Sequence, residues 1–418
     1  MRIDDQSVSE GGATCTPGRW LSIVGLGEDG LAGLSFAARM LIERAELVVG
    51  GTRHLELARE AIRGKTMAWP SPIADAWPHV EAMRGRPVVV LASGDPFFYG
   101  VGTQIAALFP ADETLCLPQP SAFSLAASRL RWSLQDTSLV TLHGRRLEGI
   151  VRYLQPGARI LALSWDGDTP AKLAKLLCER GFGESEVTVL EALGGLHERV
   201  RSAKASALSL ADVVPLNLIA VEVRAEAGTK IVTLSPGLDD DLFESDGQLT
   251  KREIRSVTLS SLAPRQGELL WDVGLGAGSI AIEWLLRHPS MRAIGFEERP
   301  ERAERAARNA AALGTPDLRI VTGHAPEAFA DQTRPDAVFI GGGLGDAGMF
   351  EAVWNALKPG GRLVANAVSL ESEALLIELA RAHGGDLTRL SVARAERLGT
   401  MTAWQSALPI TQWRVSKP

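Results

Sequence analysis

The chain has 418 residues, 45% of them hydrophobic and 22% charged, and a formal net charge of −6. This length exceeds what one hydrophobic core supports and predicts two or three domains. The negative charge argues against a nucleic-acid-binding protein, which would normally carry a basic face. The longest apolar runs, such as VVVLA at 88–92, fall far short of the roughly 20 residues that span a membrane. We therefore expect a soluble, cytoplasmic protein that binds neither nucleic acid nor membrane.

The first residues and the cysteines indicate a reducing compartment. Residues 1–18 are polar and acidic and lack the apolar segment of a signal peptide, so we expect a disordered leader. Cys15, Cys116 and Cys178 lie far apart and form no C-x-x-C pair. We expect inert thiols, at least two of them buried. No His and Cys residues are spaced as metal ligands, so we expect no bound metal.

From Trp20 to about Val223, strand-like apolar runs alternate with helical patterns, which is typical of an α/β domain. We expect strands at 21–26, 45–51, 86–93, 138–143, 159–165, 186–193 and 216–223. The clearest helix is at 170–181, where apolar residues recur at i, i+3 and i+4 and a glycine follows. Little room for a crossover precedes 138–143, so some strands should be antiparallel.

An acidic, turn-rich stretch at 226–247 predicts a linker between domains at 19–225 and 248–418. A second α/β series follows. Its expected strands are 268–275, 291–298, 318–323, 336–343 and 360–368, with helices near 278–287, at 301–314 and up to Leu357. The segments LTRLSVARAERLG and PITQWRVSKP near the end alternate like an antiparallel hairpin.

The tetrapeptide VGLG occurs at 24–27 and again at 273–276, each time where an apolar run gives way to a helical pattern. A strand-to-helix turn of this kind binds a phosphate or a nucleotide. The strand after the second VGLG ends in the acid Glu297, whereas the strand after the first ends in VVGG. The two halves are therefore not an internal repeat, and the same turn is expected in two architectures.

In the second turn, WDVGLGAGS, Asp272 precedes three alternating glycines. Glycines let the backbone approach a ligand closely, and Asp272 is expected to fix the loop and help to hold an amino-acid moiety. Glu297 is placed to accept hydrogen bonds from both hydroxyls of a ribose. The candidate cofactor-binding residues of this loop are Asp272, Gly274, Leu275, Gly276, Ala277 and Gly278.

Further motifs in the second half define a resemblance. With GHAPE at 323–327 and the segments DAVFIGGG and LKPGGRLV, the order of elements resembles a class I S-adenosylmethionine-dependent methyltransferase of Rossmann-like fold. TKREIRSVTLSSL at 250–262, PDAVFIGGG at 335–343 and GGRLVANAVSLES at 360–372 resemble, more narrowly, the decarboxylating cobalt-precorrin methyltransferase domain, over essentially all of 236–418. The resemblance implies that Thr250 and Ala325 also contact the cofactor.

The first half resembles another family. SIVGLGEDG, LASGDPFFYGVG at 91–102 and PSAFSLAASRL at 120–130 are similar to the tetrapyrrole methylases, and HGRR, EALGGLHERV and PLNLIAVE extend the match across about 19–224. That family binds S-adenosylmethionine between the two α/β lobes of a class III fold. The implied cofactor-binding residues are Gly25, Leu26, Gly27, Gly94, Asp95 and Leu193. Glu28 stands where the family usually has proline, which leaves the shape of this loop open.

Together the resemblances imply one S-adenosylmethionine per domain and a reduced, polycarboxylated tetrapyrrole as substrate. They imply C5 methylation by 19–225, and C15 methylation with decarboxylation of an acetate by 248–418, giving precorrin-8X in aerobic cobalamin biosynthesis. Both families commonly self-associate, so we expect a homo-oligomer. Because cationic side chains bind carboxylates, the substrate-binding candidates are Arg145, Arg146, Lys251, Arg252 and Arg255. His143 and His324 are candidate proton carriers, since imidazole titrates near neutrality.

Two other interpretations stay open. Because of Glu28, the N-terminal half could be a degenerate methylase that serves as a binding or assembly module. Either glycine loop could also belong to a nicotinamide-dependent oxidoreductase. Binding of NAD without affinity for S-adenosylmethionine would favour the latter.

Overall fold

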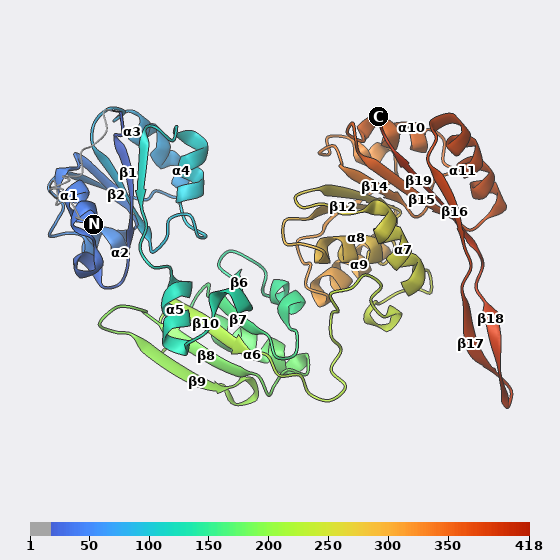
Figure 1. Ribbon diagram of the computed structural model, residues 1–418, viewed down its shortest axis with the longest axis horizontal. Helices are drawn as coiled ribbons and strands as arrows, with labels where there is room; N and C mark the ends of the chain where they lie inside the picture. The colour runs from blue at the N-terminus through green and yellow to red at the C-terminus, as the bar shows by residue number, and fades with distance from the viewer. Residues whose placement is uncertain (1–17) are drawn as a thin grey trace, which may run out of the picture. The chain divides into compact units, whose positions relative to one another are not determined.

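The computed structural model describes residues 18–418, which form two compact units (Figure 1). The first unit contains the chain up to Gly144 and Gly157–Ala227, and the second contains Arg145–Pro156 and Gly228–Pro418. The predicted leader lies outside the described residues except for Gly18. Most of the predicted linker, from Gly228 onward, is grouped with the second unit.

The first unit begins with a parallel five-stranded sheet in the order β3-β2-β4-β1-β5. Its strands are β1 (Leu21–Leu26), β2 (Leu47–Gly50), β3 (Lys65–Ala68), β4 (Val88–Ser93) and β5 (Thr114–Leu117). Helices α1 (Phe36–Arg44) and α2 (Thr52–Leu57) pack on one face, and α3 (Trp77–Glu81) and α4 (Gly102–Leu108) pack on the other. A sheet covered on both faces explains the continuous apolar runs of β1 and β4.

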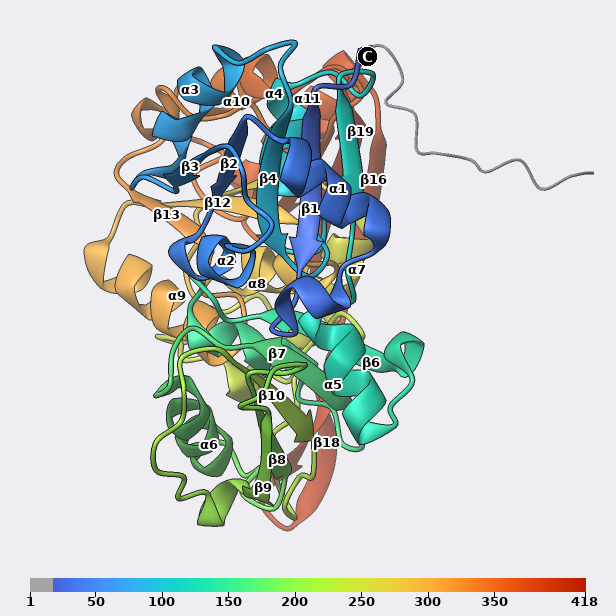
Figure 2. The same ribbon diagram turned by 90° about the vertical axis from the view of Figure 1, so that its left-hand side faces the viewer.

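A second five-stranded sheet completes this unit in the order β6-β7-β10-β8-β9 (Figure 2). Its strands are β6 (Thr137–Thr141), β7 (Arg159–Leu163), β8 (Glu186–Glu191), β9 (Arg199–Lys204) and β10 (Asn217–Glu222), with helices α5 (Ala122–Leu130) and α6 (Thr169–Glu179). The expectation of antiparallel strands is confirmed for β10 and β9. The strand that prompted it, β6, pairs parallel with β7.

A seven-stranded sheet, β13-β12-β11-β14-β15-β19-β16, forms the second unit. The strands are β11 (Leu269–Val273), β12 (Arg292–Glu297), β13 (Arg319–Thr322), β14 (Ala337–Ile340), β15 (Arg362–Ala367), β16 (Asp386–Leu390) and β19 (Ile410–Ser416). The helices are α7 (Arg252–Leu262), α8 (Ser279–Leu286), α9 (Pro300–Ala312), α10 (Met349–Ala356) and α11 (Leu370–His383). Strand order reverses between β11 and β14, where open α/β sheets bind ligands.

The predicted antiparallel pairing of LTRL with PITQWRVSKP is confirmed in β16 and β19, and the chain between these strands forms a separate hairpin. Its strands are β17 (Ala393–Leu398) and β18 (Met401–Ser406), which pair only with each other. β19 lies antiparallel between β15 and β16. Its Trp413 is fully buried and donates its indole N–H to the carbonyl of Gly384 at 2.9 Å. This hydrogen bond ties β19 to the turn that precedes β16.

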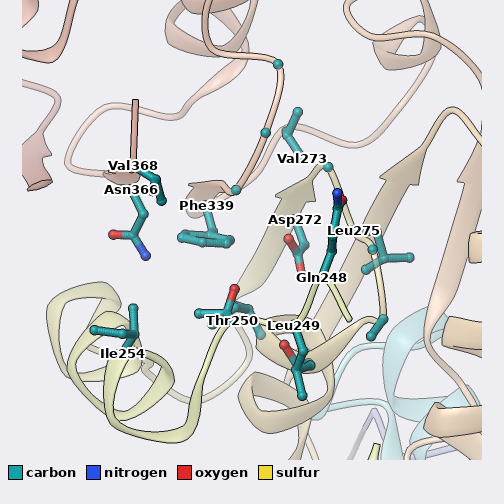
Figure 3. Close-up of a pocket in the computed structure, with 18 of the residues that line it drawn as sticks. Gln248, Leu249, Thr250, Ile254, Asp272, Val273, Leu275, Phe339, Asn366 and Val368 are labelled. Atoms are coloured by element: carbon teal, nitrogen blue, oxygen red, sulfur yellow. The ribbon is translucent and has the colours of Figure 1, made fainter. Parts of the chain in front are cut away.

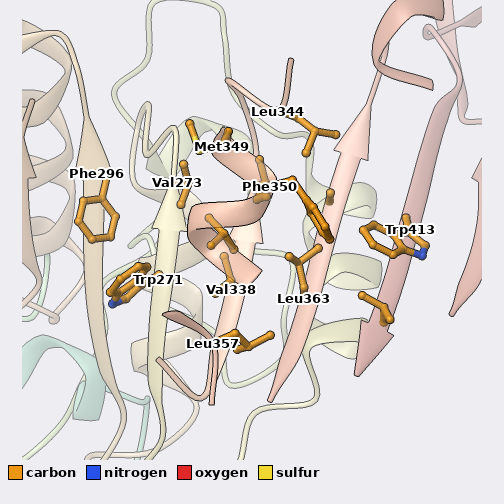
Figure 4. Packing of buried hydrophobic residues seen from close by; sticks show 14 of the residues in the cluster. Trp271, Val273, Phe296, Val338, Leu344, Met349, Phe350, Leu357, Leu363 and Trp413 are labelled. Atoms are coloured by element: carbon orange, nitrogen blue, oxygen red, sulfur yellow. The ribbon is translucent and has the colours of Figure 1, made fainter. Parts of the chain in front are cut away.

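One face of this sheet carries a continuous apolar core (Figure 4). Trp271 and Phe296 from adjacent strands lie edge to face with ring centroids 5.1 Å apart, and Val338, Leu363 and Trp413 continue the layer. Each such side chain contributes roughly 1.5–3 kcal/mol when fully buried. The core holds five neighbouring strands of the sheet together.

The start of the second unit is fastened by a buried ion pair. Arg255 and Glu283 are both fully buried, with Nε and Oε1 2.8 Å apart. Glu283 also accepts the N–H groups of Gly237 and Leu238, at 2.6 and 3.0 Å. The prediction that Arg255 binds substrate is therefore wrong, because its side chain is enclosed within the protein.

Other expectations concern thiols, membranes and metals. Cys116 is half-buried and Cys178 is exposed, so the prediction that at least two cysteines are buried is wrong. None of the helices within 18–418 is both long and apolar enough to cross a bilayer. Over the same range, no three His, Cys, Asp or Glu side chains are grouped as a metal site.

Candidate functional site

The second unit contains a cavity of about 860 Å³ at the carboxyl ends of its parallel strands (Figure 3). Asp272 lies at the end of β11 and Glu297 ends β12, and the glycine loop runs between β11 and α8. Gly274 has a φ of +75°, and a Cβ there would lie 2.9 Å from the backbone nitrogen of Gly342. Only glycine allows the loops after β11 and β14 to approach this closely.

Both acids of this cavity are fixed by backbone donors. Glu297 accepts the N–H of Gly276 at 2.8 Å and that of Arg299 at 3.1 Å. Asp272 accepts the N–H of Ala281 at 3.0 Å. Burial, together with the nearby charge of Glu297, raises the pKa of Asp272 to about 8, although the Ala281 N–H opposes this. A cation placed beside Asp272 would favour its ionised form.

Most residues predicted for the second half line this cavity. They are Thr250, Lys251, Asp272, Gly274, Leu275, Gly276, Ala277, Glu297, His324 and Ala325. In Figure 3, Thr250, Asp272 and Leu275 border the same space. The exposed His324 has Nδ1 3.2 Å from the Glu327 carboxylate, whose hydrogen bond raises the pKa of the imidazole.

Besides the buried Arg255, two predicted residues of the second half lie outside this cavity. Gly278, with φ +78°, starts α8, and a Cβ there would lie 3.2 Å from that of Ala306 on α9. Its role is close packing of two helices rather than contact with the cavity. Arg252 is exposed and pairs with Asp239 at 3.2 Å. It does not border the cavity.

The cavity also includes side chains that sequence reasoning missed. Arg299, Arg302, Asn366 and Arg394 all line it. Arg302 is held by Asp246 at 2.9 Å and by Gln248 at 2.8 Å. Asn366 lies within the segment GGRLVANAVSLES, whose resemblance to the precorrin methyltransferase domain assigns no role to any single residue.

A second cavity, of about 660 Å³, lies within the first unit and is bordered by residues from both of its sheets. Of the predicted residues, Leu26, Gly27, Gly94, Asp95, His143 and Leu193 line it. Asp95 accepts the N–H of Phe97 at 2.9 Å, which closes the GDPFFYG turn. Gly25 does not line the cavity. A Cβ there would lie 2.0 Å from the Gly94 carbonyl oxygen, so Gly25 allows the two loops to meet.

Glu28, the departure from the family pattern, has a charged partner in this cavity. Its carboxylate pairs with the guanidinium of Arg53, and both residues line the space. Arg53 Nη2 lies 3.0 Å from His54 Nε2 and 3.2 Å from Ser93 Oγ. Because arginine only donates, His54 Nε2 must accept and the ring is neutral. Burial, and then the charge of Arg53, lower the pKa of His54 to about 4.

Arg145 and Arg146 do not line the first unit's cavity, which corrects the sequence prediction. Both belong to the segment grouped with the second unit, where Arg146 Nη1 donates to the Pro316 carbonyl at 3.4 Å. Among the described residues that border the first cavity, Arg53 alone carries a permanent positive charge. The dipeptide RH at the start of α2 was the available signal, but it lies 25 residues after Glu28.

Two family matches cover nearly all of the chain that the structure describes. Residues 21–209 match the tetrapyrrole (corrin/porphyrin) methylases, and residues 241–417 match the precorrin methyltransferase domain. With one glycine-loop cavity in each unit, the chain is a methyltransferase built from two different folds.

Comparison with named proteins identifies the family within this class of methyltransferases. A precorrin-6Y C(5,15)-methyltransferase (decarboxylating) from Sinorhizobium is 53% identical over 398 residues, which are 95% of this chain and 96% of that protein. The chain belongs to this family.

Two shorter relatives each match less than half of the chain. A "Probable cobalt-precorrin-6B C(15)-methyltransferase (decarboxylating)" from Pyrobaculum calidifontis is 36% identical over 183 residues, covering 42% of this chain and 93% of that protein. A cobalt-precorrin-7 C(5)-methyltransferase from Salmonella typhimurium is 30% identical over 192 residues, covering 45% and 92%.

Proposed function

We propose that this protein transfers methyl groups from S-adenosylmethionine to C5 and C15 of a reduced, polycarboxylated tetrapyrrole and decarboxylates one acetate side chain, giving precorrin-8X in aerobic cobalamin biosynthesis. The observation that carries this is the presence of two separate glycine-loop cavities in one chain. We assign C5 methylation to 19–225, and C15 methylation with decarboxylation to 248–418. The names of the two shorter relatives support this division.

We propose one cofactor molecule in each cavity. In the second unit, the buried Asp272 favours a neighbouring cation, and the carboxylate of Glu297 is oriented for ribose hydroxyls. In the first unit, Gly27, the Gly94–Asp95 turn and Leu193 would hold it. When bound, S-adenosylmethionine supplies an electrophilic methyl group. Titration calorimetry with S-adenosylhomocysteine should then give two sites per chain.

The chain's own task is to hold the ring carbon in line with that methyl group and to exclude water, because the enamine-like carbons of a reduced tetrapyrrole are already nucleophilic. Cationic side chains would bind its carboxylates: Arg53 in the first cavity, and Lys251 and Arg299 in the second. His143 and His324, each at the border of a cavity, remain our candidates for proton carriers.

The decisive experiment is the product mass after the full chain reacts with a reduced precorrin and deuterated-methyl S-adenosylmethionine. We expect two labelled methyl groups and the loss of one CO₂. Asp95→Ala should abolish one label only, whereas Glu297→Ala should abolish the other label together with decarboxylation. If the wild type never labels C5, the N-terminal half is a binding module, the interpretation that Glu28 left open.

Membership of a methyltransferase family rules out the nicotinamide oxidoreductase. We further propose that the protein works in the cytoplasm as a homo-oligomer without nucleic acid, which its net charge of −6 supports.

A further inference from the structure

Asn366, the last residue but one of β15, lines the second unit's cavity and is held by a buried network of hydrogen bonds. Its Oδ1 accepts from Gln412 Nε2 at 2.9 Å, and its Nδ2 donates to Thr258 Oγ1 at 3.0 Å. Gln412 Nε2 also reaches Thr258 Oγ1 at 3.2 Å, and Ser261 Oγ donates to Gln412 Oε1 at 2.6 Å. Thr258 and Gln412 are almost completely buried.

The network determines which way the Asn366 amide faces. Ser261 donates to Gln412 Oε1, so the Gln412 nitrogen must face Asn366 and Thr258. A nitrogen there can only donate, which places Oδ1 of Asn366 opposite Gln412 and leaves one N–H of Nδ2 without a partner in the network. In Figure 3 the amide nitrogen lies on the side of Phe339 and the oxygen on the far side. The group offered to the cavity is an uncharged donor.

The surroundings of this donor are apolar. Asn366 pairs with Gln412 across β15 and β19, and two residues along β19 Ile410 pairs with Leu390. Ile410, Leu390 and Val368 all border the cavity. The cavity's cations come from other segments: Lys251 precedes α7, Arg299 and Arg302 flank the start of α9, and Arg394 on β17 is paired with Glu253.

Building on the function proposed above, we propose that Asn366 and the apolar walls beside it form the subsite for the acetate that is decarboxylated. One neutral donor holds a carboxylate oxygen, while the absence of an ion pair leaves the carboxylate poorly stabilised. The bond between the methylene and carboxyl carbons breaks, its electron pair enters the ring, and CO₂ leaves. A proton first taken up by the ring ends on the methylene carbon, so R–CH₂–COO⁻ and H⁺ give R–CH₃ and CO₂.

Thr258, Gln412 and Ser261 are positioning residues in this scheme, and the isosteric change Asn366→Asp tests it in the full-length protein. An aspartate can still accept from Gln412 and from the Thr258 hydroxyl, so the network stays satisfied, but it opposes a carboxylate. We expect the decarboxylated fraction of the labelled product to fall about 10- to 100-fold, as for a lost hydrogen bond to a charged group. Binding of S-adenosylhomocysteine should change less than about twofold.

Three further variants sharpen the test. Thr258→Val should shift the product in the same direction by a smaller factor, and Thr258→Ser should restore it. The matched control is Asn355→Asp, on the exposed side of α10 and outside the cavity. The proposal is overturned if Asn366→Asp keeps the wild-type ratio of decarboxylation to C15 methylation, whether both reactions are unchanged or both are slowed by the same factor. If the wild type itself labels no tetrapyrrole, the proposed function fails instead.

Discussion

We expect Asp272 to make cofactor binding depend on pH. Its pKa of about 8 means that the carboxyl is protonated at neutral pH in the free protein. A ligand that carries an ammonium or sulfonium group favours the ionised form, so binding must release a proton. The affinity of the second unit for S-adenosylhomocysteine should therefore rise with pH until about pH 8, and level off above it.

Calorimetry in buffers of about pH 6.5 and 8.5 measures this effect, and the dissociation constant should differ by about tenfold or more. Asp272→Asn, which cannot ionise, should flatten the profile. An unchanged slope in that variant would show that another group titrates.

The proposed role of Arg53 in substrate binding can be compared with that of Arg146, which the sequence predicted to bind substrate. Arg53 borders the first cavity, whereas Arg146 does not. Arg53→Gln should lower C5 methylation about tenfold or more by removing a charged donor to a substrate carboxylate, and C15 methylation in the same protein serves as the internal standard. Arg146→Gln should leave the ratio of the two methylations unchanged. If Arg146→Gln lowered C5 methylation and Arg53→Gln did not, Arg146 would be the substrate-binding residue, as the sequence predicted.

At the scale of elements, helix α7 distinguishes a structural arginine from an exposed one. Arg255 lies on its buried face, and Arg252 points to solvent beside Asp239. Arg255→Met leaves the Glu283 charge buried with only backbone donors, which should cost about 3–5 kcal/mol of unfolding free energy. Arg252→Gln should cost less than about 0.5 kcal/mol.

Scanning calorimetry of the full chain should show this difference as a lower unfolding temperature of the second unit in Arg255→Met. If Arg255→Met kept the wild-type transition and raised only the KM for tetrapyrrole, Arg255 would be a substrate ligand after all.

At the scale of the whole molecule, the hairpin β17–β18 extends from the second unit's sheet (Figure 1). It exposes Leu398, Met401 and Trp404 to 65%, 69% and 77%. Isolated hairpins are marginally stable, and exposed large apolar side chains on such a hairpin mark an interaction surface. We expect the homo-oligomer to form through this hairpin.

Light scattering after size-exclusion chromatography measures the molar mass of the particle and so tests this interface. Replacing all three hairpin residues with glutamine should lower the molar mass of the particle toward that of one chain. Leu234→Gln, at a similarly exposed leucine outside the hairpin, is the control. An unchanged mass in the triple variant would place the interface elsewhere.

The strands that the sequence predicted are those with a continuous apolar run. The three strands of the first unit that it missed, β3, β5 and β9, each lie at the edge of a sheet and have no fully buried residue. An edge strand pairs on one side only and can stay polar, so its sequence carries little pattern. Apolar runs therefore locate the inner strands of a sheet more completely than its edge strands.

By itself, the sequence determined two α/β units, their glycine loops and the acids Asp272 and Glu297, because turns and strand ends depend on residues close together in the chain. Only the tertiary structure decided which charged side chains face a cavity. Glu28 meets Arg53, Arg255 meets Glu283, and Asn366 meets Gln412. Each pair joins residues from different elements, and helical periodicity shows that a helix has a buried face without showing which distant group lies against it.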